Sequence, residues 1–261
     1  MKTKNRILAA VLAVVLAFGL TACGGGGKED AKDVYKAAME KMNSLESMAA
    51  GMDITVKMSD GSESMDITMD AEMKIQDIKK ESMALSMDMN VGMSGITMAM
   101  QAYYADGWYM METMGQKMKY QMPLEDAMGQ AAMSQGMDLS ALGEITMEEK
   151  NGEKTLSYQA DIAKMKDANT EEYLSFLDSL GLGDLADTGL TYETVEGTMT
   201  VNSEGYATSN TIHIVASIEE DGQSMEMDIN VAVTYENPGQ DVTVEIPDAS
   251  EFTEIDPSTL G

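Results

Sequence analysis

Few residues in this sequence could carry out acid–base or nucleophilic chemistry. The 261-residue chain has one histidine and one cysteine against 45 aspartates and glutamates. His213 lies between Ile212 and Ile214, so strand alternation predicts that it points to a polar, solvated face. The chain has no G-x-S-x-G motif, phosphate-binding loop or histidine cluster, and carboxylates are too numerous for any pair to stand out. We therefore expect no enzymatic activity, no catalytic residue and no cofactor.

Methionine is the residue type in surplus, with 28 copies. Its flexible thioether fills irregular apolar space and is also a soft ligand for Cu(I). The segments Met87-Asp88-Met89 and Met98-Ala99-Met100 have an M-x-M spacing, which would place two sulfurs on one face of a strand. That spacing also follows automatically from any apolar strand face, and no histidine or cysteine is nearby. Cu(I) binding is therefore a minor alternative, and no metal-binding residue is assigned.

The single cysteine ends an N-terminal targeting segment. Residues 1–22 begin with three cations and continue as the uncharged apolar run Ile7–Leu20, which has the length of a signal-peptide core. The run leads into Leu20-Thr21-Ala22-Cys23, which resembles the bacterial lipobox. The resemblance implies lipid attachment at Cys23 and anchoring to the extracytoplasmic face of the bacterial cell membrane. The alternative is an ordinary signal peptide with an incidental cysteine.

The charge of the chain excludes one class of partner. The formal net charge of −28 becomes −31 once the three cations of the signal peptide are removed. Such a protein repels nucleic-acid backbones and anionic lipid headgroups alike, so we expect no nucleic-acid binding. Membrane attachment must then depend on acyl chains rather than on a basic patch.

The rest of the chain alternates between helical and strand periodicity. Residues 23–30 form a glycine-rich tether, and Ala31 to Leu45 has helical spacing. Four strands with apolar residues at every second position follow, separated by short turns, in the ranges 52–58, 65–75, 83–93 and 96–104. Further expected elements are a weak helix over Pro123–Met133, short strands around Ile145–Glu148 and Lys154–Ala160, a helix over 169–180, and strands at Leu190–Asn202, Ile212–Ile218, Met225–Val233 and Val242–Ile246.

A sheet with one apolar face must cover that face. The expected fold is α+β: a long antiparallel sheet curled into a half-barrel, with three helices over its concave apolar face. We expect one domain over residues 31–247 and a loosely ordered C-terminal tail over 248–261.

A family resemblance supports this architecture. The chain resembles half-barrel lipoproteins of the LolA and LppX/LprG kind in four features. These are the lipobox, the glycines 24–27, the helix Val34–Leu45 that enters a one-sided meander, and the closing segment Val244-Glu245-Ile246-Pro247. The similarity is greatest to Met-rich Gram-positive members. The resemblance implies that the concave face holds lipid acyl chains.

The leading hypothesis is therefore a tethered lipoprotein that binds or carries an apolar ligand, lipid above all. The residues expected to line the site share the apolar face of the strands: Met65, Met69, Met83, Met87, Met98, Met100, Ile214, Met225 and Met227. Ala127, Met128 and Ala131 would belong to a weakly docked helix that acts as a lid. The alternative is a solid-core surface module for interaction or envelope assembly, with an unknown protein partner.

Overall fold

The computed structural model describes residues 30–60, 64–131, 142–162, 191–220 and 223–256. The described residues from Ala31 onward belong to one compact unit. In chain order the described elements are α2 (Ala31–Asn43), β1 (Met48–Ser59), β2 (Ser64–Gln76), β3 (Ala84–Met93), β4 (Ile96–Ala105), β5 (Trp108–Thr113), β6 (Gln116–Gln121), α3 (Leu124–Ala131), β7 (Leu142–Lys150), β8 (Glu153–Ala160), β9 (Thr191–Val201), β10 (Ala207–Glu220), β11 (Gln223–Tyr235), the 3-10 helix η3 (Ala249–Glu251) and β12 (Thr253–Glu254).

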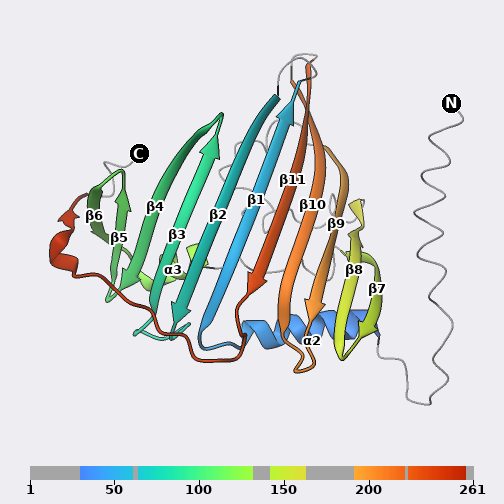
Figure 1. The fold of residues 1–261 in the computed structure, drawn as a ribbon, viewed down its shortest axis with the longest axis horizontal. Coiled ribbons are helices and arrows are strands. Elements are labelled where there is room, and N and C mark those ends of the chain that lie inside the picture. Colours follow the sequence, from blue (N-terminus) through green and yellow to red (C-terminus); the bar gives the residue numbers. More distant parts are fainter. Residues whose placement is uncertain (1–29, 61–63, 132–141, 163–190, 221–222, 257–261) are drawn as a thin grey trace, which may run out of the picture. The chain divides into compact units, whose positions relative to one another are not determined.

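All twelve strands belong to one sheet in the order β12-β6-β5-β4-β3-β2-β1-β11-β10-β9-β8-β7 (Figure 1). Neighbouring strands are antiparallel, except that β12 runs parallel to β6. The pairing of β1 with β11 joins the meander β1–β6 to the strands β7–β11. This large antiparallel sheet is consistent with the predicted half-barrel. The described residues contain two α-helices rather than the predicted three, and the third, expected over 169–180, lies outside the described residues.

The cross-strand register gives the sheet two chemically different faces. Residues directly opposite one another point to the same side, and side chains alternate along each strand. One face, called the inner face, carries the row Ile54, Val231 and Ile212. The outer face carries polar side chains between them, such as Asp53 and Thr211.

α2 packs on the inner face and forms a first core cluster with β1 and β7–β11 (Figure 1). Val34, Tyr35 and Ala38 are its buried residues, and their spacing of one, three and four positions places them on one side of the helix. The rings of Tyr35 and Tyr158 meet edge to face with centroids 5.7 Å apart. The helix expected from Ala31 to about Leu45 is confirmed to within two residues.

A second core cluster lies on the inner face of β2–β5. Its buried residues come from four strands, the adjoining loops and α3: Ile75, Met83, Leu85, Ala102, Tyr104, Tyr109, Met122 and Ala127. Burial raises the pKa of Tyr109 to about 12, since ionisation would leave a charge in this apolar setting.

Sequence periodicity did not predict β5 and β6. Their connection is a two-residue turn in which Met114 has φ 51° and Gly115 has φ 76°. Both residues adopt positive φ, as a type I′ hairpin turn requires. Asparagine or aspartate normally takes the first position, so the methionine concealed this turn.

The expected strand Val242–Ile246 and the expected loose tail are corrected by the structure. Residues 242–246 run across the strand ends instead of pairing with them, because polar side chains hold their backbone amides. The amide of Val242 donates to Ser47 Oγ (3.1 Å), and that of Val244 donates to Gln76 Oε1 (3.1 Å). Beyond Pro247 the chain forms η3 and β12, and Phe252 is buried. The folded domain thus continues to residue 256.

Candidate apolar ligand-binding face

The inner face of β2, β3 and β4 continues beyond the second core cluster towards the strand ends drawn uppermost in Figure 1. On β2, Ile67 and Met69 pack against the first core cluster. We call this region the open patch and define it by residues that alternate with polar positions on the three strands: Met65, Ile67, Met69, Met89, Val91, Met93, Ile96, Met98 and Met100.

The register makes the open patch continuous across the three strands. Ile67 lies opposite Met93, which lies opposite Ile96. Two residues further along the strands, Met69, Val91 and Met98 form a second row of directly opposed residues. Directly opposed side chains have Cβ atoms about 5 Å apart, so the rows form one apolar surface.

Large apolar side chains in the open patch are accessible to solvent. The exposed fractions are 68% for Ile96, 49% for Met98, 46% for Met93 and 38% for Met65. Isolated apolar residues on a surface are common, but neighbouring ones on three adjacent strands form a patch of the kind that binds a partner or ligand.

The structure separates the predicted lining residues into three groups. Met65, Met98 and Met100 lie in the open patch, and Met69 lies where the patch meets the first core cluster. Met87 borders the patch against the second core cluster. The residues on β10 and β11 belong to or pack against the first core cluster: Ile214, Met225 and Met227. Met83 precedes β3 and is 1% exposed within the second core cluster.

Sequence reasoning did not place Met89, Val91, Met93 and Ile96 in the site. Their alternation was visible, but nothing in it distinguishes an apolar residue under a helix from one left open. Among the described elements, the positions of α2 and α3 make that distinction.

The predicted lid residues belong to α3, which lies beside the second core cluster. Ala127 is 2% exposed, and Met128 packs against that cluster. The side chain of Ala131 lies outside the described residues. Whether α3 moves stays a prediction.

The outer face opposite the open patch is acidic and hydrogen-bonded. Asn90 Nδ2 donates to Asp70 Oδ1 (2.9 Å), and Gln101 Nε2 donates to Asp88 Oδ1 (2.5 Å). These bonds join neighbouring strands and leave the carboxylates in water. The same three strands therefore present carboxylates on one side and exposed methionines on the other.

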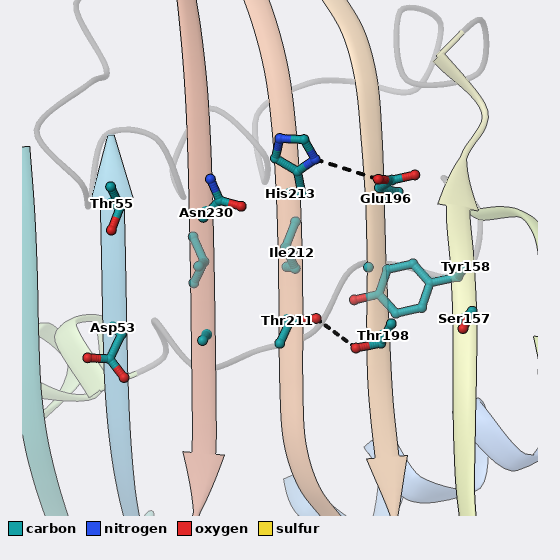
Figure 2. A pocket seen from close by; sticks show the side chains of 13 residues that line it. Asp53, Thr55, Ser157, Tyr158, Glu196, Thr198, Thr211, Ile212, His213 and Asn230 are labelled. Carbon is teal, nitrogen blue, oxygen red and sulfur yellow. Dashed lines mark hydrogen bonds and ion pairs between the residues drawn. The ribbon is translucent and has the colours of Figure 1, made fainter. Parts of the chain in front are cut away.

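A hollow of about 550 Å³ lies on the outer face of β1 and β8–β11 (Figure 2). Polar side chains from five strands reach it, among them Asp53, Thr55, Glu196, Thr198, Thr211 and Asn230, and Ile212, Val231 and Ala232 add apolar surface. His213 is flanked by two carboxylates, with Nδ1 3.5 Å from Glu196 Oε1 and Nε2 3.4 Å from Asp228 Oδ1. No spacing along one strand could reveal this hollow, because five strands contribute to it.

The predicted lipid-attachment residue Cys23 and the signal peptide 1–22 lie outside the described residues. Within the described ranges, no helix combines the length and apolarity needed to cross a bilayer.

Residues 30–250 match a family described as a family of unknown function, DUF6612. The chain belongs to this family. The match spans nearly all of the described sheet, so the fold described above is that of a DUF6612 domain. No curated protein matches the sequence.

Several solved structures show a distant likeness to this DUF6612 chain. LprF from Mycobacterium bovis has 13% identity and a TM-score of 0.40, covering 83% of this chain and 96% of its own. Rv2717c from M. tuberculosis has 7% identity and a TM-score of 0.24, covering 80% and 99%. A DUF1329 protein from Desulfovibrio piger has 9% identity and a TM-score of 0.25, covering 84% and 96%. All three scores are below 0.5, and no ligand is inferred from them.

Proposed function

We propose that this DUF6612 protein is an extracytoplasmic lipoprotein, anchored through Cys23, that binds or carries an apolar ligand on the open patch. The ligand class is lipid. The observation that carries the proposal is the exposure of Met65, Met93, Ile96 and Met98 on one continuous apolar surface.

The composition of the open patch favours acyl chains over a rigid ligand. Methionine has three rotatable side-chain bonds and adapts to mobile apolar groups. The net charge of −28 repels phosphate headgroups, so binding energy must come from the apolar part of the ligand.

The test uses the mature chain with Cys23→Ala, so that no acyl group of its own occupies the site. A fluorescent fatty acid is titrated into this protein and displaced with unlabelled lipid. In Ile96→Glu/Met98→Glu, two carboxylates enter the open patch, and we expect the affinity for the probe to fall by at least about tenfold.

The matched control is Thr97→Glu/Ala99→Glu on the same strand. Thr97 and Ala99 are also exposed but point to the outer face. The control carries the same added charge, so we expect its affinity to stay within about twofold of the parent. The proposal would be contradicted if both variants lost the same affinity for the fluorescent fatty acid, or if the parent did not bind the fatty acid at all.

The outer-face hollow favours a second candidate, a surface module that contacts a protein partner through its polar side. Its carboxylates would suit a cationic partner. A parent chain that takes up no lipid probe would favour this candidate over lipid binding.

A further inference from the structure

Within the described residues, no group of three or more His, Cys, Asp or Glu side chains could hold a metal ion. Thioethers are a different kind of donor, and the structure brings several of them together. Two M-x-M segments, Met87–Met89 and Met98–Met100, lie on the neighbouring strands β3 and β4. Met89 is directly opposite Met100.

The register places four thioethers on one side of the sheet. Met98 is the inner-face residue two positions before Met100 on β4. It faces Val91, which neighbours Met89 on the inner face of β3. Directly opposed Cβ atoms are about 5 Å apart, and diagonal neighbours are about 7–8 Å apart. A methionine sulfur extends well beyond Cβ on a flexible stem, so the sulfurs of Met89, Met98 and Met100 can converge on one ion.

This cluster is accessible from solvent. Met98 is 49% exposed, and Met87, Met89 and Met100 are partly exposed. By contrast, Met227 on β11 is 2% exposed and has apolar neighbours on the first core cluster. An ion could therefore reach the sulfurs on β3 and β4 without unfolding the sheet.

We infer that Met89, Met98 and Met100, bordered by Met87, form a binding site for Cu(I). Soft thioether ligands select Cu(I), whereas Mg²⁺ and Ca²⁺ require oxygen ligands and Zn²⁺ requires thiolate, imidazole or carboxylate. The acidic chain also raises the local concentration of cations around the site. M-x-M spacing alone would occur on any apolar strand, but the opposition of two such segments depends on the pairing of β3 with β4.

The site does not depend on lipid binding, although it lies within the open patch. Met→Leu substitutions remove sulfur and keep the apolar surface, with small expected effects on stability. They therefore separate loss of the metal site from loss of the apolar surface.

The experiment titrates Cu(I) anaerobically into the mature Cys23→Ala chain in competition with a chromogenic Cu(I) chelator. We expect one equivalent to be retained by the parent and the affinity to fall by at least about 30-fold in Met89→Leu/Met98→Leu/Met100→Leu. X-ray absorption at the copper edge of the parent complex should show a first coordination shell that contains sulfur and no nitrogen or oxygen.

The matched control is Met42→Leu/Met114→Leu/Met147→Leu. These residues lie apart on α2, the β5–β6 turn and β7, so the control removes the same number of sulfurs without touching the cluster. Its affinity for Cu(I) should remain within about twofold of the parent. Equal weakening of the two triple variants, or no retention by the parent, would overturn the inference. A far-ultraviolet circular dichroism spectrum and a urea midpoint equal to those of the parent show that the sheet of the Met89→Leu/Met98→Leu/Met100→Leu variant is intact.

Discussion

At the scale of single residues, one buried hydrogen bond organises the core beneath α2. Tyr158 Oη donates to Asn210 Oδ1 (2.8 Å), and Asn210 is the buried polar residue of the described core. Gly197 makes room for the ring, because a Cβ there would lie 2.6 Å from Tyr158 Cζ. Burial raises the pKa of the Tyr158 hydroxyl further above neutral pH, so the group remains a donor in alkaline solution as well.

We expect Tyr158→Phe to lower the free energy of unfolding by about 1–3 kcal/mol, because Asn210 Oδ1 then stays buried without its donor. Urea denaturation followed by circular dichroism measures the change. Tyr103→Phe, on the partly exposed outer side of β4, is the control and should change stability little. A loss of similar size in both variants would mean that the hydrogen bond is not the cause.

At the scale of elements, the segment after β11 determines how one end of the sheet is protected. β12 pairs with β6 through Thr253 and Glu254, and the amide of Ile255 donates to Lys119 O (2.9 Å). Lys117 Nζ donates to Glu251 Oε2 (2.6 Å), and Lys119 Nζ donates to Ala249 O (2.6 Å). An unpaired edge strand invites association with other chains, and this segment pairs with part of that edge.

We expect Phe252→Ala to undock this segment, since a buried phenyl ring is lost. Amide hydrogen exchange in β6 should then accelerate by at least about tenfold, while exchange in β10 stays as in the parent. Glu254→Ala, whose side chain is exposed on β12 two residues further on, is the control. Unchanged exchange in β6 would show that Phe252 does not hold the segment in place.

At the scale of the whole molecule, charge repulsion opposes folding. The chain has 45 acidic and 17 basic residues, and the acidic side chains gather on the outer face. Ion pairs in the described part offset little of this, because those of Lys36 and Lys80 are largely exposed.

We therefore expect added sodium chloride to stabilise the mature Cys23→Ala chain by screening repulsion between carboxylates. Thermal unfolding in low salt and in about 0.5 M salt, where the Debye length is shorter than about 8 Å, measures the effect. Lower stability in the higher salt would mean that attractive ion pairs outweigh the repulsion.

The sequence alone determined α2, most of the long strands and the two faces of the sheet, but not β5, β6 or the path of residues 242–246. Alternation in residues 65–75 and 83–93 predicted strands, which the structure shows as β2 and β3. The same alternation decides which side of each strand is buried, because a one-residue shift would turn every apolar side chain to water. The spacing of Val34, Tyr35 and Ala38 likewise predicted the buried side of α2. These are short-range properties, which each segment carries within itself.

Only the tertiary structure decided which strands are neighbours and which apolar residues remain open. Nothing local indicates that β1 pairs with β11, that Met89 faces Met100, or that Met83 is buried while Met98 is exposed. Nor does local pattern show that residues 242–246 cross the strand ends, held by Ser47 and Gln76. The physical reason is that one apolar strand face suits a packed core, a lipid surface or a thioether site equally well. The choice depends on what packs above it, and that contact comes from residues far away in the chain.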